Sequence, residues 1–427
     1  MKLGGTTMEI NKLCSLIEER KDELFSLLSE LIKINSESFK TYGKEEECAK
    51  HIYILCKEME LECDIFSPMD IKDFDKHSDY LSGRNLENRY NVVARYCGIE
   101  DADELMLMAH TDTVRIGDLA DWKKDPLSGE IIDGKIHGRG ACDDKYAIAT
   151  MLFVMKLLKE NGFKPKKNLL FAAYCDEEYG GSHGALSTVL KYPAQRIVSM
   201  DGQEGQIWHC GSGGGEMKYF FHTKEPVDSA KIAAKAIPVI VDTIEETFAE
   251  NRRREMEENR FYRGTSIPET SLRYTGVRAG NNGGELGKGE VGFVFYTDKD
   301  KSEVYSELEK VENILNEKLE PLGIVGDGFE PATRFFHYVF CEPDSEDVKL
   351  MVEASKEATG EEPIVCGSCL SDLSVISKYG SDRAYGFGAS RDFSAYGGPH
   401  QPNEYIECDK FLDFTKTIGT YILKVLS

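Results

Sequence analysis

The chain has 427 residues, of which 41% are hydrophobic, and a formal net charge of −23 at pH 7. This length exceeds what one ordinary hydrophobic core supports, so we expect two domains. The balance of 75 acidic against 52 basic residues argues against a nucleic-acid partner, which needs a basic surface. No apolar run approaches the roughly 20 residues of a membrane span, so we expect no membrane partner.

The N-terminal segment MKLGGTTMEINK lacks the apolar stretch of an export signal. The 12 cysteines are scattered along the chain. Because disulfides form in oxidising compartments, we interpret them as reduced thiols and expect a cytoplasmic protein. Cys366 and Cys369 form a CGSC segment. A zinc ribbon would need a second such pair, so we interpret these two as incidental loop thiols.

Helices and strands are predicted to alternate in the first half of the chain. Apolar residues at helical spacing predict helices over 8–34, 45–60 and 146–162, the last ending at Gly162. Buried strands are predicted over 90–96, 104–110, 168–175 and 196–200. Alternation of this kind predicts an α/β fold in which helices cover both faces of a sheet.

The composition changes near residue 211, where the glycine-rich segment CGSGGGE begins. A strand over 289–297 and a helix over 304–323 follow it, ahead of a return to α/β patterning. We therefore predict a smaller inserted α/β domain and a main domain formed by both ends of the chain. The predicted bounds are 212–327 for the inserted domain, and 1–211 with 328–427 for the main domain.

The segment LMLMAHTDTV (105–114) is an apolar strand that runs into His110 and Asp112. Ligands bind at the carboxyl ends of strands in α/β sheets, and residues two apart point to the same side of a strand. An imidazole beside a carboxylate suggests a metal ligand whose tautomer is set by the acid. Taken alone, such a pair is more often an ordinary hydrogen-bonded pair.

Other acids and one histidine occupy similar places along the chain. Asp143 and Asp144 precede a predicted helix, the sequence DEE (176–178) and Asp201 follow predicted strands, and His400 lies in a Gly/Pro-rich loop. Each feature alone is compatible with a solvated acidic turn or a helix N-terminus. Together they supply only His, Asp and Glu at strand ends and turns, which predicts a site for zinc, cobalt or manganese.

These segments resemble a family, the co-catalytic zinc amidohydrolases that include acetylornithine deacetylase, succinyl-diaminopimelate desuccinylase, glutamate carboxypeptidase and the zinc dipeptidases. The resemblance rests on AHTDTV, on W...P..G.I.DGKIHGRGACDDK, and on DEE, MDG and GGPHQPNEYIE, which occur in the family's order and at similar spacing. It implies a mixed-sheet catalytic domain, an inserted lid or dimerisation domain, and a homodimer.

The resemblance also implies two divalent metal ions, Zn²⁺ or alternatively Co²⁺ or Mn²⁺. The implied roles are His110 and Asp201 for the first ion, Asp143 as the bridge, Glu178 and His400 for the second ion, Glu177 as the general base, and Asp112 as the partner of His110. The chemistry agrees, because two adjacent cations need a shared anion. A carboxylate that takes up a proton cannot at the same time be a metal ligand.

The predicted inserted domain departs from the family's pattern. The family carries there a histidine that reaches the oxyanion, often across a dimer, and an arginine after the last strand that grips the substrate carboxylate. His222 is the candidate histidine, although it falls within a predicted strand, ahead of the expected place. Arg278 and Arg391 are alternative candidates for the arginine.

Two classes of function remain open. The first is an enzyme that hydrolyses an amide in a small N-acyl amino acid, as a deacetylase or desuccinylase does, or in a short peptide, with dipeptidase or aminopeptidase specificity. The second is a non-catalytic binding relative. Loss of a metal ligand or of Glu177 would favour the second class, and all of these residues are present.

Overall fold

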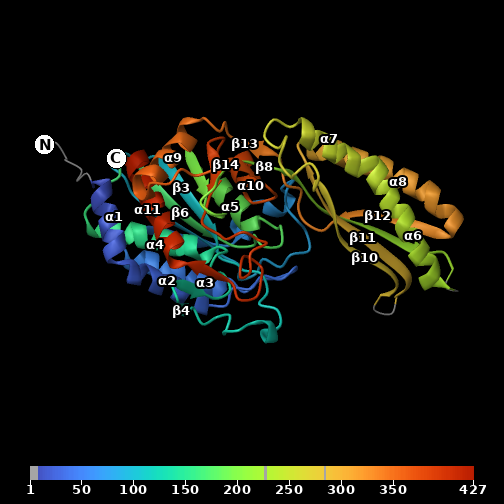
Figure 1. The fold of residues 1–427 in the computed structure, drawn as a ribbon, viewed down its shortest axis with the longest axis horizontal. Helices are drawn as coiled ribbons and strands as arrows, with labels where there is room; N and C mark the ends of the chain where they lie inside the picture. The colour runs from blue at the N-terminus through green and yellow to red at the C-terminus, as the bar shows by residue number, and fades with distance from the viewer. Residues whose placement is uncertain (1–7, 226–227, 283–284) are drawn as a thin grey trace. The chain divides into compact units, whose positions relative to one another are not determined.

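The computed structural model describes residues 8–225, 228–282 and 285–427 (Figure 1). The chain divides into two compact units. The second unit comprises Cys210–Val339 and Gly367–Ser374, and the remaining described residues form the first unit. None of the helices in these described ranges is long and apolar enough to cross a membrane.

A nine-stranded mixed sheet forms the centre of the first unit. Its order is β1-β2-β6-β3-β7-β15-β8-β13, and β14 pairs with β8. The strands are β1 (Glu62–Phe66), β2 (Asn91–Tyr96), β3 (Asp103–His110), β6 (Asn168–Tyr174), β7 (Arg196–Ser199), β8 (Ile207–Gly211), β13 (Val339–Phe340), β14 (Val365–Ser368) and β15 (Ala384–Phe387). Neighbours in the run β6-β3-β7-β15 are parallel, so their carboxyl ends share one edge.

Helices cover both faces of this sheet, as the sequence predicts. They are α1 (Ile10–Glu19), α2 (Lys21–Lys33), α3 (Glu46–Glu58), α4 (Lys145–Glu160), α5 (His183–Lys191), α9 (Glu346–Thr359) and α11 (Cys408–Leu426). The three-residue α10 (Leu373–Val375) falls mainly in the second unit. Leu105 and Leu107 of β3 pack in one large apolar cluster with α4 and α11, while Met106 on the other side of the strand is equally buried. Helix α5 also contacts the sheet, and its buried residues lie outside that cluster.

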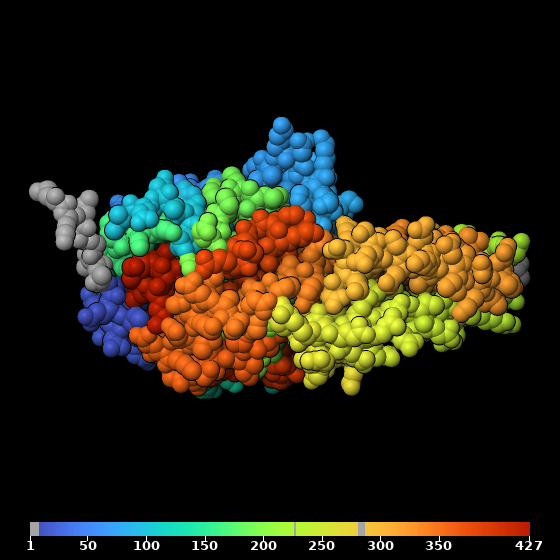
Figure 2. All heavy atoms as spheres, turned by 90° about the horizontal axis from the view of Figure 1, so that it is seen from above, coloured from blue at the N-terminus to red at the C-terminus, as the bar shows by residue number. Residues whose placement is uncertain are grey.

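The prediction of a single helix over 8–34 is wrong. The chain leaves helical geometry at Arg20 and forms two helices. Each has its own partner: α1 packs mainly on α11 and α2 on α4. Figure 2 shows the first and last helices side by side on the surface, in dark blue and dark red. The apolar spacing continues across the break, so the sequence carries no local signal of it.

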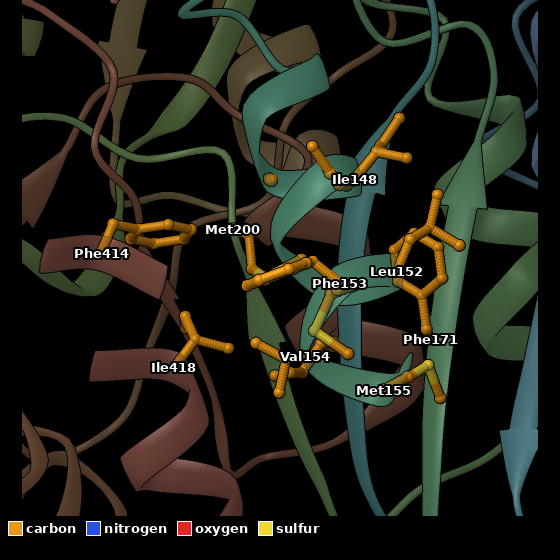
Figure 3. Packing of buried hydrophobic residues seen from close by; sticks show 14 of the residues in the cluster. Ile148, Leu152, Phe153, Val154, Met155, Phe171, Met200, Phe414 and Ile418 are labelled. Atoms are coloured by element: carbon orange, nitrogen blue, oxygen red, sulfur yellow. The ribbon is translucent and has the colours of Figure 1, made fainter. Parts of the chain in front are cut away.

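Helix α4 is apolar around most of its circumference and is therefore buried on nearly every side. In Figure 3 its Leu152 faces Phe171 of β6, while Phe414 and Ile418 of α11 approach from another direction. The helix begins directly after Asp143 and Asp144. Its packing therefore fixes the position of the turn that carries these two carboxylates.

A small three-stranded sheet joins two distant segments of the first unit. Its strands are β4 (Ile131–Ile132), β5 (Lys135–His137) and β16 (Tyr405–Glu407). Strand β16 pairs with β5, with Tyr405 opposite His137. The loop that contains His400 is thereby tied to the turn that leads into α4.

The second unit contains a four-stranded antiparallel sheet in the order β10-β11-β9-β12. Its strands are β9 (Gly213–Thr223), β10 (Leu272–Asn282), β11 (Glu285–Thr297) and β12 (Ile324–Pro331), and its helices are α6 (Ser229–Ile244), α7 (Glu250–Glu258) and α8 (Lys301–Leu319). Phe221 and Phe293 of the sheet pack with Ile240 of α6 and Leu315 of α8. This α/β unit therefore has an apolar core of its own.

Candidate metal centre

Three parallel strands bring predicted ligands to one edge of the large sheet. Met108 of β3 is paired with Ser199 of β7, and the N–H of Met200 donates to the carbonyl of Met108 at 2.8 Å. The same register, continued by two residues, places His110 level with Asp201. On its other side His110 is paired with Tyr174 of β6, two residues before Asp176. Strand pairing thus collects three of the sequence motifs at one place.

Asp143 lies between two histidines. Its Oδ1 is 2.9 Å from Nε2 of His110, and its Oδ2 is 3.2 Å from Nε2 of His400. Nε2 of His400 also lies 2.8 Å from Oε2 of Glu178. The two oxygens of one carboxylate therefore face two different imidazoles, which is the arrangement that a carboxylate bridging two cations requires.

The donor set fits a metal ion. His110, Asp143 and Glu178 each offer a ligand atom, and these three atoms all lie within 4.8 Å of one another. The side chains of His110 and Glu178 are almost completely buried. Imidazole nitrogen and carboxylate oxygen are the ligands that zinc and related divalent metals take in hydrolytic sites.

The carboxylates of the site shift the protonation of both histidines. Burial disfavours the charged form of His110, but Asp143, Glu177 and Asp144 together outweigh burial and raise the pKa of His110 well above the ordinary value. Burial acts in the same sense on His400, and Glu178 with Asp143 raises its pKa to about 12. Burial raises the pKa of Glu178 itself. The site therefore concentrates negative charge that favours a cation among these side chains.

Asp112 serves the site through two different groups. Its backbone carbonyl lies 2.9 Å from Nδ1 of His110, whereas its carboxylate oxygen is 3.7 Å from that nitrogen. An Nδ1–H that donates to the carbonyl leaves Nε2 available as a ligand. The carboxylate accepts the backbone N–H groups of Glu177 at 3.1 Å and Glu178 at 3.2 Å. Asp112 therefore holds both the imidazole and the glutamate turn.

The two adjacent glutamates have different surroundings. Oε1 of Glu178 accepts the N–H of Val114 at 2.9 Å, while Oε2 faces His400. Glu177 is only half-buried, and its charge contributes to the raised pKa of His110. Asp201 is half-buried too, and its charge adds to burial in raising the pKa of Asp144. The structure thus brings both residues near the His110–Asp143 pair.

Sequence reasoning missed a buried ion pair that supports this arrangement. Glu404 accepts the backbone N–H of Cys142 at 3.0 Å and lies 2.6 Å from Nη1 of Arg139. It therefore connects the His400 loop to the turn that carries Asp143. The signal available in the sequence was the position of Glu404 within the same GGPHQPNEYIE segment as His400.

Of the residues singled out in the second unit, His222 lies within β9, and its Nδ1 is 2.8 Å from Oδ1 of Asp327. Both side chains are 40% exposed. Its role toward an oxyanion stays a prediction. Arg278 lies on β10 and is 67% exposed, with its Nε 3.7 Å from a carboxylate oxygen of Glu290.

Neither sequence candidate for the carboxylate-binding arginine directly follows the last strand of the four-stranded sheet. In chain order the last strand of the four-stranded sheet of the second unit is β12, and Arg334 follows it. Arg334 is buried, and its guanidinium lies 4.1 Å from the ring centre of Phe336. Arg391 belongs to the first unit, where it lies 3.9 Å from the ring centre of Tyr405 and pairs with Glu407 at 3.2 Å.

The fold and the His/Asp/Glu cluster at the strand ends indicate a metal-binding α/β protein. The model of peptidase family M20/M25/M40 matches residues 106–424, and the chain belongs to this family. Membership confirms the predicted resemblance to this family.

Individual relatives agree with this family. The chain is 32% identical over 178 residues to an uncharacterized metallohydrolase of Methanocaldococcus jannaschii, a match that covers 38% of each protein. It is 32% identical over 198 residues to a β-Ala-Xaa dipeptidase of Lactobacillus delbrueckii subsp. lactis, covering 44% of this chain and 38% of that one. The matches therefore span less than half of these curated relatives. The dipeptidase Dug1p of Saccharomyces cerevisiae has the same fold, with a TM-score of 0.74 at 15% identity over 98% of both chains.

Proposed function

We propose that this protein hydrolyses the amide bond of a small N-acyl amino acid or a short peptide with the help of two divalent metal ions. The observation that carries the proposal is the position of Asp143, whose two oxygens face His110 and His400. The proposed ligands are His110, Asp143 and Asp201 for one ion, and Asp143, Glu178 and His400 for the other. These ligands suit zinc, with cobalt or manganese as alternatives.

Metal ions bound there would polarise the substrate carbonyl and acidify water. Glu177 is the residue that moves the proton: it accepts one from the attacking water and donates it to the leaving nitrogen. Its backbone N–H is held by the carboxylate of Asp112, which fixes the turn from which the side chain extends. Glu178 is engaged with His400 and Val114, so the two glutamates divide the roles of ligand and base.

Deacylase and dipeptidase specificity both fit this chemistry. Similarity to a β-Ala-Xaa dipeptidase supports a peptide substrate, and the sequence motifs equally resemble those of deacetylases and desuccinylases. A panel of N-acetyl amino acids, N-succinyl amino acids and dipeptides, assayed with added zinc, cobalt or manganese, separates them. Hydrolysis of any member supports the proposal. A metal-loaded protein that cleaves none would instead be a non-catalytic binding relative.

We further propose that residues 212–327, which fall within the second unit, act as a lid and dimerisation domain. The support is the separate apolar core of that unit and the family resemblance. Light scattering tests the homodimer: it should give twice the 48.0 kDa mass of one chain. A cytoplasmic location stays a prediction.

A further inference from the structure

A buried guanidinium lies behind the glutamate turn. Arg89, just ahead of β2, is completely buried. Its Nη1 is 2.6 Å from Oδ1 of Asp176, its Nη2 is 3.9 Å from Oδ2 of Asp112, and its Nε donates to Oε1 of Glu45 at 2.9 Å. Nη2 also donates to Oγ of Ser38 at 3.0 Å. One side chain thus connects carboxylates from three separate segments of the chain.

Two of these carboxylates lead directly to the proposed catalytic glutamates. Asp176 immediately precedes Glu177 in the chain. Asp112 accepts the backbone N–H groups of both Glu177 and Glu178. The turn is therefore held at its start by Asp176 and from the side by Asp112, and Arg89 lies against both acids.

We propose that Arg89 is a positioning residue for the proposed hydrolysis: by holding Asp112 and Asp176 in a fixed relation, it sets where Glu177 and Glu178 stand relative to His110 and Asp143. The inference rests on the proposed function. Arg89 acts through these two aspartates rather than through a proposed metal ligand.

Stability alone is a weak explanation for this cluster. Taking charges out of water is costly, and well-packed apolar residues often stabilise a core as well as a buried ion pair does. What a guanidinium offers is a planar set of donors in a fixed geometry. Asp176 has two further partners, Arg84 at 3.1 Å and His183 at 2.5 Å. Arg89 differs from these two partners because it also approaches Asp112.

The test is Arg89→Lys in the full-length, metal-loaded protein. Lysine keeps the positive charge, but its single ammonium group cannot donate to several carboxylates at once as the planar guanidinium does. Changes to residues that orient metal ligands commonly cost roughly 10–100-fold in activity or metal affinity. We expect kcat to fall by about that factor with KM unchanged, and we expect the visible absorption spectrum of the Co²⁺-loaded protein to shift because Glu178 is displaced.

The matched control is Arg252→Lys. Arg252 of the second unit is equally buried, and its Nη2 pairs with Glu255 at 2.7 Å and with Glu307 at 2.5 Å. The same substitution there should lower stability in a similar way but leave kcat and the Co²⁺ spectrum as in the wild type. If Arg89→Lys does not fold, Asp176→Asn removes the Arg89–Asp176 ion pair with little change of side-chain shape. The same kinetic and spectroscopic measurements then apply to that variant.

The outcomes separate this inference from the proposed function. A lowered kcat and an altered Co²⁺ spectrum in the Arg89 or Asp176 variant, absent from the Arg252 variant, support the positioning role. Unchanged kcat and spectrum in a folded variant, or an effect on KM alone, overturn it. If the wild type binds Co²⁺ but hydrolyses no substrate of the panel, the proposed function fails, while the spectrum still tests Arg89.

Discussion

Two histidine–aspartate pairs of almost equal length occur in the two units of this protein. In the first unit, Nε2 of His110 is 2.9 Å from Asp143. In the second, Nδ1 of His222 is 2.8 Å from Asp327. The two pairs differ in their exposure to solvent. His110 is fully buried and Asp143 nearly so, whereas both members of the second pair are 40% exposed.

The difference shows that a pair of this kind does not define a site. The charges of an exposed pair are screened by water, so each interaction is weak. Around the buried pair, His400 and Glu178 add further donors. The side chain of Glu178 is buried, whereas that of His400 is 42% exposed. The number of donors gathered around one buried pair therefore distinguishes the candidate metal centre from a surface ion pair.

The largest effect that sharpens this comparison is expected for Asp143→Ala. Because Asp143 faces both histidines, its loss should remove both metal ions and abolish hydrolysis. His400→Ala should weaken mainly one ion. Metal analysis of the purified variants measures both results against a wild type that binds close to two ions per chain. Retention of a full metal complement by Asp143→Ala would show that the carboxylate is not a bridge.

The next largest effect is expected for Glu177→Gln. Glutamine keeps the size of the side chain but cannot take up the proton, so turnover should fall by roughly 10²–10⁴, the usual contribution of general acid–base catalysis. Metal content should stay at the wild-type level, because Glu177 is not a proposed ligand. Steady-state kinetics and metal analysis of the same preparation provide the two measurements.

Glu178→Gln is the matched control for that variant. It should lose metal affinity first, and added metal should partly restore activity, because glutamine is a poorer ligand than a carboxylate. If Glu177→Gln empties the metal site while Glu178→Gln keeps it, the two glutamates have exchanged roles. If Glu177→Gln keeps full turnover, another group is the base.

The approach of His110, Asp201 and the glutamate turn was predictable because these residues follow apolar strands whose carboxyl ends meet. Asp112 was predicted as a partner of His110, but the bonding of its carboxylate to the glutamate backbone was not. Arg89 and Glu45 were missed because each lies in a segment rich in charged residues, which is typical of a solvated surface. Their burial depends on packing between positions 44 residues apart, which no local pattern records.

The second unit was less predictable for a similar reason. The strand predicted over 289–297 lies within β11. Strand β12 (Ile324–Pro331) follows it and occupies the sheet edge. Edge strands tolerate Gly and Pro, so the segment IVGDGFEP lacks the apolar pattern of a strand. Arg334, just beyond it, was therefore not among the sequence candidates.

The dependence of metal binding on pH offers a smaller test of the candidate metal centre. Glu178 and Asp143 raise the pKa of His400 to about 12 in the absence of a cation, so a metal ion must displace a proton to reach this imidazole. Affinity should therefore weaken as the pH falls, by about tenfold per unit for each proton displaced. Calorimetry in two buffers of different ionisation enthalpy counts the protons released. No release at pH 7 would contradict this account.

The smallest effect is expected in the second unit, for His222→Gln. The exposed pair with Asp327 contributes about 0–1 kcal/mol to the free energy of unfolding, as surface ion pairs usually do, and His222 is no proposed ligand. Metal content should therefore equal that of the wild type, and denaturant unfolding should show little change, with Asp327→Asn as the control. A loss of metal would break the comparison between the two pairs. The kcat of the same variant tests the predicted oxyanion role separately: a fall of tenfold or more with both ions in place supports it, because only contact with the substrate would link this exposed histidine to turnover.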